Sequence, residues 1–317
     1  MGSEQKWVRV KNISPTGVYL FTNNRWTPGS TIQLTLQGRR LPHRDSRLRV
    51  QLSARCVRLG EDGVGLAFVN EHINTAAWLK LMVKAAALPV QNDLVRLFCI
   101  TKALAFLRDV SPSAEQQVLK VIAGAISLER IDDTVAIVLR AEEFLASWNC
   151  VTRTGVNPIL ILRILKEGPK TRGEQLQQCW AGLLATCCFA GSEDNASLCY
   201  ITLLSRLDQI QIRILAAAWS KAMQAGWEAG FIFSKSLSCM ADEIRTITGV
   251  GDLVRVEWAL NHLHRLGLLE QTVKVCPIEQ IERVNLTPTA LGLKLYARCI
   301  GKIAIPETFD IEKVDRF

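Results

Sequence analysis

The sequence predicts a multidomain protein in which a small antiparallel β-barrel precedes a mostly α-helical domain with a winged-helix-like C-terminal part. Residues 7–69 contain short apolar runs separated by turn signals, a pattern typical of strands. After Asn70 the apolar residues take helical spacing instead. The 317 residues fit about two domains. The changes of pattern place a barrel at 1–75, a helical domain at 76–235 and a winged-helix-like region at 236–317.

Five short strands are expected in the N-terminal range, at residues 7–11, 17–22, 31–36, 50–59 and 64–69. Thr27-Pro28-Gly29 is a turn signal ahead of the third strand, and an Asp-Gly pair lies between the last two. Residues 38–49 form a polar, arginine-rich loop or hairpin. Antiparallel strands of this length favour a small barrel, because closing the sheet removes its exposed edges.

Helices are expected at residues 75–87, 92–110, 112–127, 132–148, 173–190 and 197–219, and a further helix begins at Pro158. Ser111-Pro112 and Asn157-Pro158 each place a capping residue directly before a proline. This order favours the start of a helix, because proline has no N–H to leave unpaired in the first turn.

The C-terminal range has the pattern of a winged helix. Residues 257–270 have helical spacing and include a glycine near their end, 271–275 and 283–286 are candidate wing strands, and 287–300 are a closing helix. Such a fold suggests DNA binding. However, residues 241–300 hold seven Lys or Arg and seven Asp or Glu. The charge balance therefore disfavours DNA, whose binding depends on neutralising phosphates.

Positive charge is concentrated in the predicted barrel. The chain has a net charge of +8, and residues 1–75 contribute +6 of it through eleven basic and five acidic residues. Arginine is the preferred planar donor to phosphate, so this distribution suggests a phosphate-bearing partner. A basic surface that only contacts solvent is the alternative interpretation.

Several classes of protein are disfavoured by the remaining residue types. The ten cysteines form no Cys-x-x-Cys pair and are not spaced with the four histidines as zinc ligands. We expect buried free thiols, no metal and no cofactor. Catalytic signatures such as a Gly-x-Ser-x-Gly elbow are missing, so we do not expect an enzyme. Residues 1–11 show no signal peptide, and no apolar stretch is long enough for a membrane span. We expect a cytoplasmic protein.

The polar segment Asn12-Ile13-Ser14-Pro15-Thr16-Gly17 lies between the first two predicted strands. It matches the Asp/Asn-x-Ser-x-x-Gly half of a nucleotide-binding signature. The strand order around it and the Gly63-Val64-Gly65-Leu66-Ala67-Phe68 segment extend the match over residues 7–75. This region resembles a PilZ domain, a family of six-stranded barrels that typically bind the bacterial messenger cyclic di-GMP.

The resemblance implies roles for particular residues. Asn12 and Ser14 would contact a guanine or a phosphate, Gly17 would let the strand pass close to the ligand, and Arg9 is added as a nearby cation. The family's Arg-x-x-x-Arg pair does not precede Asn12. We therefore expect either that the chain as given starts late or that the domain lacks this arm. Arginines of the loop at 38–49 are a candidate replacement, and a simple turn without ligand is the alternative.

A second resemblance covers residues 90–300. It rests on Asn157-Pro158, on the segments 173–176 and 180–185, on Leu203 with Leu207, and on Leu286-Thr287-Pro288, Leu291-Gly292 and Ala297-Arg298-Cys299. These positions are similar to the Abi-alpha group, helical bacterial proteins with a suspected antiphage role. That group has no established catalytic residues, so the resemblance implies no site.

Three functions follow as hypotheses. The first is a regulatory protein whose PilZ-like barrel binds cyclic di-GMP and signals to the helical region through protein contacts or self-association. The second is an abortive-infection effector or toxin whose barrel does not bind nucleotide. The third is a DNA-binding regulator that uses the winged helix.

Overall fold

The computed structural model describes residues 8–14, 16–37, 49–69, 93–123, 128–147, 155–189, 194–229, 237–270 and 283–301. The chain divides into two compact units. Unit 1 contains Met1–Glu142 and Thr154–Leu165, and unit 2 contains Glu143–Arg153 and Lys166–Phe317. The predicted domain boundaries at 75 and 235 and the predicted helix at 75–87 lie outside the described residues.

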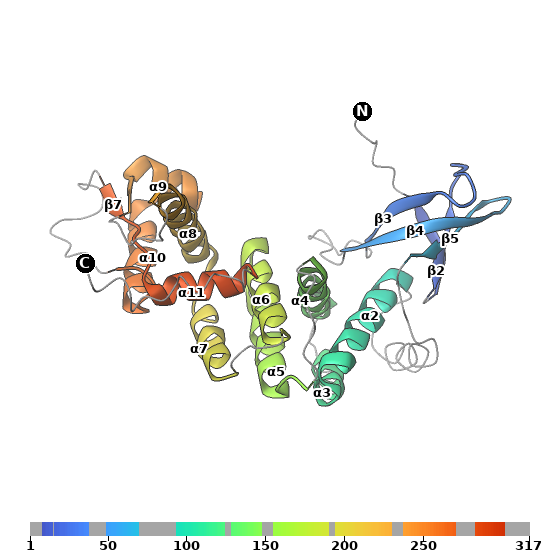
Figure 1. Ribbon diagram of the computed structural model, residues 1–317, viewed down its shortest axis with the longest axis horizontal. Coiled ribbons are helices and arrows are strands. Elements are labelled where there is room, and N and C mark those ends of the chain that lie inside the picture. The colour runs from blue at the N-terminus through green and yellow to red at the C-terminus, as the bar shows by residue number, and fades with distance from the viewer. Residues whose placement is uncertain are drawn as a thin grey trace. The chain divides into compact units, whose positions relative to one another are not determined.

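Unit 1 begins with a five-stranded antiparallel sheet (Figure 1). Its strands are β1 (Arg9–Ser14), β2 (Gly17–Phe21), β3 (Thr31–Gln37), β4 (Arg49–Leu59) and β5 (Gly63–Phe68), in the spatial order β1-β2-β5-β4-β3. The five predicted strands are thus confirmed. The sheet is curled like half a barrel, and within residues 8–69, as far as they are described, no pairing joins β1 to β3. The predicted antiparallel sheet is thus confirmed in the form of a half-barrel, and the described residues do not close it into a barrel.

The inner face of the sheet forms an apolar core. Successive side chains of a strand point to opposite faces, so Val18 and Leu20 of β2 and Val64 and Leu66 of β5 all point inward and are buried. Ala54 and Cys56 of β4 complete the buried cluster. Partly buried apolar residues pack against it, among them residues of β1 and β3. Burial of this face leaves the opposite face for polar residues.

Four of the helices that the structure describes contribute to unit 1: α2 (Leu94–Val110), α3 (Pro112–Ala123), α4 (Leu128–Ser147) and α5 (Pro158–Glu167). The helix starts predicted at Pro112 and Pro158 are confirmed, and Asn157 Oδ1 accepts a hydrogen bond from the Ile159 N–H at 3.0 Å. Helix α2 contacts β1, and the Phe98 ring lies 5.6 Å from that of Phe68 on β5. This contact joins the sheet to the helices of the same unit.

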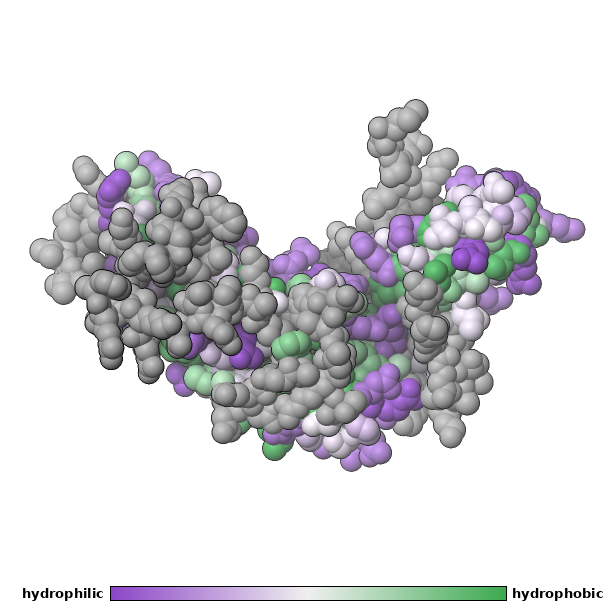
Figure 2. Space-filling view, viewed as in Figure 1, coloured by the Kyte–Doolittle hydropathy of each residue, from purple (hydrophilic) through white to green (hydrophobic). Residues whose placement is uncertain are grey.

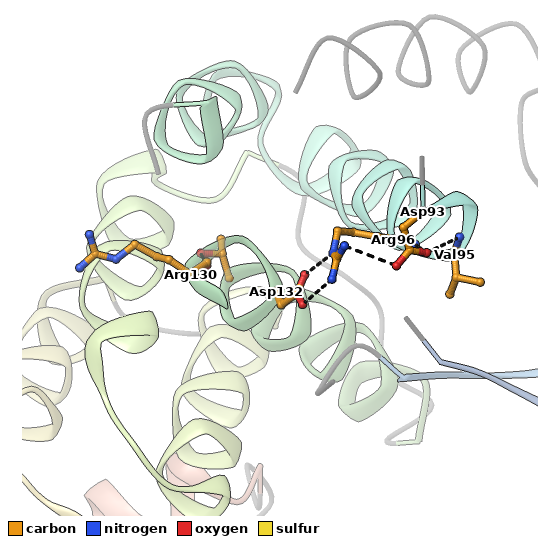
Figure 3. A network of polar contacts seen from close by, with 6 residues as sticks. Asp93, Val95, Arg96, Arg130 and Asp132 are labelled. Atoms are coloured by element: carbon orange, nitrogen blue, oxygen red, sulfur yellow. Dashed lines mark hydrogen bonds and ion pairs between the residues drawn. The ribbon is translucent and has the colours of Figure 1, made fainter. Parts of the chain in front are cut away.

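A buried ion network fixes the N-terminal end of α2 against α4 (Figure 3). Arg96 is 2% exposed and Asp132 is 3% exposed. The guanidinium of Arg96 donates to both Asp132 carboxylate oxygens, from Nε at 2.8 Å and from Nη2 at 3.2 Å. Asp93 Oδ2 lies 3.4 Å from Arg96 Nη1, and Asp93 Oδ1 also accepts from the backbone N–H groups of Val95 and Arg96. Burial raises the pKa of Asp132, because desolvation outweighs the bonds to Arg96.

Unit 2 is mostly helical. Its elements are η1 (Gly168–Lys170), α6 (Glu174–Cys187), α7 (Asp194–Leu204), α8 (Gln209–Ala229), β6 (Ser238–Met240), α9 (Ala241–Thr248), α10 (Leu253–Arg265), β7 (Arg283–Asn285) and α11 (Ala290–Cys299). The single helix predicted at 197–219 is wrong. Asp208 interrupts it, because its side chain caps α8 by accepting from the N–H groups of Ile210 and Gln211, both at 2.9 Å.

Helices α6 and α11 pack very closely. A Cβ added to Gly182 of α6 would lie 1.8 Å from the carbonyl oxygen of Cys299 on α11. Thr186 Oγ1 donates to the Arg298 carbonyl oxygen at 2.9 Å, and Trp180 is fully buried. Trp180, Gly182, Arg298 and Cys299 belong to the segments on which the second resemblance rests, so the spacing of these segments reflects helix packing.

The winged helix is not confirmed. Strand β7 falls within the predicted wing strand at 283–286, but it pairs with β6. The other predicted wing strand, at 271–275, lies outside the described residues. Helix α10 replaces the predicted helix at 257–270, and Gly267 beyond its end adopts a positive φ of 69°.

The eight cysteines within the described ranges are free, and all except Cys199 are buried. Burial raises the pKa of Cys99 to about 12. The prediction of buried thiols is therefore confirmed for seven of these eight. Among the helices that the structure describes, none is both long and apolar enough to cross a membrane.

Candidate nucleotide-binding face

A β-bulge in β1 brings the predicted site residues to one face. Val10 pairs with Leu20 and Asn12 with Tyr19, so Lys11 is an extra residue in this strand. In a regular strand Arg9 and Asn12 would point to opposite faces. Because of the bulge, Arg9 pairs with Phe21 and Asn12 with Tyr19, two residues on the same face of β2. Arg9, Asn12 and Ser14 are all exposed. The structure thus brings these three predicted residues together on the outer face of the sheet.

Most of the Asn12–Gly17 motif belongs to strands and not to a turn. Asn12 and Ser14 belong to β1, and Ser14 pairs with Gly17 at the start of β2. Ser14 Oγ donates to the Gly17 carbonyl oxygen at 3.2 Å. The Asn12 side chain makes no hydrogen bond to another described residue. The prediction of a six-residue polar turn is therefore corrected, because β1 continues through Ser14.

Gly17 has a packing reason to be glycine. A Cβ at this position would lie 2.2 Å from the Leu66 carbonyl oxygen of β5, which is backbone and cannot move aside without disturbing the strand. Close approach of two strands therefore requires glycine here. Its predicted role toward a ligand stays a prediction.

An ordered cluster surrounds the Tyr19 ring on the same face. The Tyr19 hydroxyl donates to Asp62 Oδ1 at 2.8 Å, and Lys11 Nζ donates to Asp62 Oδ2 at 2.7 Å. Lys11 Nζ also lies 5.3 Å from the Tyr19 ring centroid and 4.9 Å from that of Phe21, within range of a cation–π interaction. The hydrogen bonds from Lys11 and Tyr19 lower the pKa of Asp62. These contacts hold the aromatic ring in place.

Two arginines complete the cluster. The guanidinium carbon of Arg58 lies 5.3 Å from the Tyr19 ring centroid. Arg25 donates to the carbonyl oxygens of Gly60 and Glu61 and so fixes the turn between β4 and β5. Hydrophilic and hydrophobic residues both lie on the surface at this end of the sheet (Figure 2), where Val57 and Leu59 of β4 are exposed.

The sequence did not indicate that Tyr19, Asp62 and Arg58 meet. The alternation in β2 places Tyr19 on the same face as Gly17, and this signal was available. The position of Arg58 depends on a second bulge, which the sequence pattern does not reveal. The arginine-rich loop predicted at 38–49 was the candidate replacement for the missing pair. Its residues 38–48 lie outside the described residues, and Arg49 is the first residue of β4.

In the described part of the chain, no group of three or more His, Cys, Asp or Glu side chains could hold a metal ion. The outer face of the sheet instead carries guanidinium and ammonium groups, an aromatic ring, and the hydroxyl and amide groups of Ser14 and Asn12. This set suits an anionic ligand with a planar group.

Comparison with protein families gives two matches. The model of the PilZ domain matches residues 2–85, and the model described as abortive infection alpha matches residues 149–299. The chain joins a PilZ domain to an abortive infection alpha domain. Both predicted resemblances are thereby confirmed. Neither the curated proteins nor the solved structures yield a match. Together the two domains support a PilZ-like regulator or an abortive-infection-related protein.

Proposed function

We propose that the PilZ domain binds cyclic di-GMP on the outer face of its sheet and thereby regulates the helical region. The observation that carries this proposal is the bulge at Lys11, which presents Arg9, Asn12 and Ser14 together beside Tyr19. Asn12 offers an amide to the Watson–Crick or Hoogsteen edge of a guanine, and Ser14 and Arg9 offer donors to phosphate.

The contact between the sheet and α2 gives this binding a route to the helices. Helix α2 touches β1, the strand that carries the motif, and its Phe98 packs against Phe68 of β5. Arg96 of the same helix is fixed to Asp132 of α4. A ligand that orders β1 would therefore act on α2 and α4 through packed, buried contacts. In this proposal the protein is a binding protein, not an enzyme.

Isothermal titration calorimetry with cyclic di-GMP tests the proposal on the full chain. Asn12→Ala combined with Ser14→Ala is expected to weaken binding at least tenfold, because two polar contacts are lost. Thr35→Ala is the matched control, since Thr35 is exposed on β3 of the same sheet. Absence of heat with the unmodified chain would overturn the proposal.

The abortive infection alpha match favours a second candidate function. In that case the helical region arrests growth or protects against phage, and the sheet serves only as a scaffold. Expression in a bacterial host with and without phage challenge tests it. Growth arrest that persists in the Asn12→Ala, Ser14→Ala variant would favour this function over nucleotide control. A cytoplasmic location and the winged-helix DNA-binding function stay predictions.

A further inference from the structure

A second β-bulge, in β4, brings two arginines to the outer face of the sheet. Cys56 pairs with Leu66 and Arg58 with Gly65, so Val57 is an extra residue. Arg55 and Arg58 are three positions apart and would point to opposite faces of a regular strand. Because of the bulge, Arg55 pairs opposite Ala67 and Arg58 opposite Gly65, and both of these β5 residues are on the outer side.

The strand register places these arginines in line with the motif. One row across the sheet runs from Asn12 through Tyr19 and Gly65 to Arg58. Residues directly opposite each other in antiparallel strands share a face, so both ends of the row are outward. Strands lie about 4.8 Å apart, and the three steps from β1 to β4 span about 14 Å.

A parallel row runs from Ser14 through Gly17 and Ala67 to Arg55. Each row therefore has a polar motif residue at one end and an arginine at the other. The span between them suits a ligand of dinucleotide size that lies flat on the sheet.

The side chain of Arg58 already extends across this span. It passes over Gly65, where an added Cβ would lie 2.6 Å from Arg58 Cγ and 2.8 Å from its Nε. Its guanidinium reaches the Tyr19 ring on β2. A guanidinium held parallel to the sheet can stack on a base and also donate to a phosphate.

The Arg55 side chain is exposed and makes no hydrogen bond or ion pair with another described residue. The two arginine side chains thus differ in their contacts. Arg58 is held by an aromatic ring, whereas the donors of Arg55 are unengaged within the described part of the chain.

We propose that Arg55 and Arg58 supply the guanidinium contacts to the phosphates and a base of the bound nucleotide. This inference rests on the nucleotide-binding function proposed above. It places a phosphate and a base of the ligand at β4, across the sheet from the motif residues of β1, with Tyr19 between them.

The test is calorimetry with cyclic di-GMP on the full chain and on Arg55→Ala, Arg58→Ala and Arg58→Lys. Each alanine variant is expected to weaken binding about 10- to 100-fold, since charge-assisted hydrogen bonds are lost. Arg58→Lys is expected to recover only part of the affinity, because lysine keeps the charge but not the planar donor. Arg255→Ala removes the same charge from an exposed position of α10 and should leave affinity unchanged.

The outcomes separate the inference from the function on which it rests. Binding by the unmodified chain with less than a twofold effect of both alanine variants would overturn the inference and leave the proposed function intact. Absence of binding by the unmodified chain would overturn both. Circular dichroism of each variant checks that the sheet is folded, which is expected because Arg55 and Arg58 are exposed.

Discussion

Gly17 and Gly65 lie on neighbouring strands, and a side chain at each would meet a different kind of obstacle. At Gly17 the obstacle is the Leu66 backbone carbonyl, which belongs to the pairing of β2 with β5. At Gly65 it is the Arg58 side chain, which is exposed and can move aside. A glycine within a ligand motif can therefore be required by the fold alone.

Gly17→Ala is expected to destabilise the protein by roughly 1–3 kcal/mol, because the added methyl group forces two strands apart. Urea denaturation followed by circular dichroism measures the change. Gly251→Ala is the control, since nothing lies within 4 Å of a Cβ there and its φ is not positive. An unchanged midpoint for Gly17→Ala would contradict the packing explanation and return Gly17 to a ligand role.

At the scale of elements, the Arg96 network determines how α2 and α4 pack. A buried ion pair adds little net stability compared with an apolar pair of the same shape, since both charges must be desolvated. Removing one partner is different, because it leaves an unpaired charge in the interior. The network therefore acts mainly as a positional constraint on α2, the helix that contacts the sheet.

Arg96→Met is expected to destabilise the protein by about 3–5 kcal/mol, because Asp132 would remain buried without its cation. The double variant Arg96→Met, Asp132→Leu should recover part of this loss. Arg108→Ala is the matched control on the same helix, where an exposed pair with Asp109 contributes little. Thermal denaturation compares the four proteins, and an equal effect of Arg96→Met and Arg108→Ala would contradict the account.

The sequence predicted elements better than it predicted their irregularities. Alternation and turn residues predicted all five strands, because burial of one face imposes a period of two. The bulges at Lys11 and Val57 were not predictable in this way, since one extra residue changes the face of a side chain without changing composition. The break before Asp208 was missed for a related reason. The apolar spacing continues past it, although α7 ends at Leu204 and the capping bonds of Asp208 start a new helix.

The whole molecule combines two domains that match separate family models. Their presence in one chain does not by itself show that one regulates the other. Two features of unit 1 favour a link here. The strand that carries the motif contacts α2, and the chain passes from unit 1 to unit 2 within α4 and again within α5. In the proposed function, a ligand that orders β1 acts first on α2, within unit 1.

Hydrogen exchange of the full chain with and without cyclic di-GMP is the most direct test of nucleotide binding on the outer face of the sheet. If the ligand binds as proposed, backbone amides in β1, β2 and β4 exchange more slowly when it is bound, and so do those in α2. Unchanged exchange in these strands at saturating ligand, or protection confined to unit 2, would contradict the proposal.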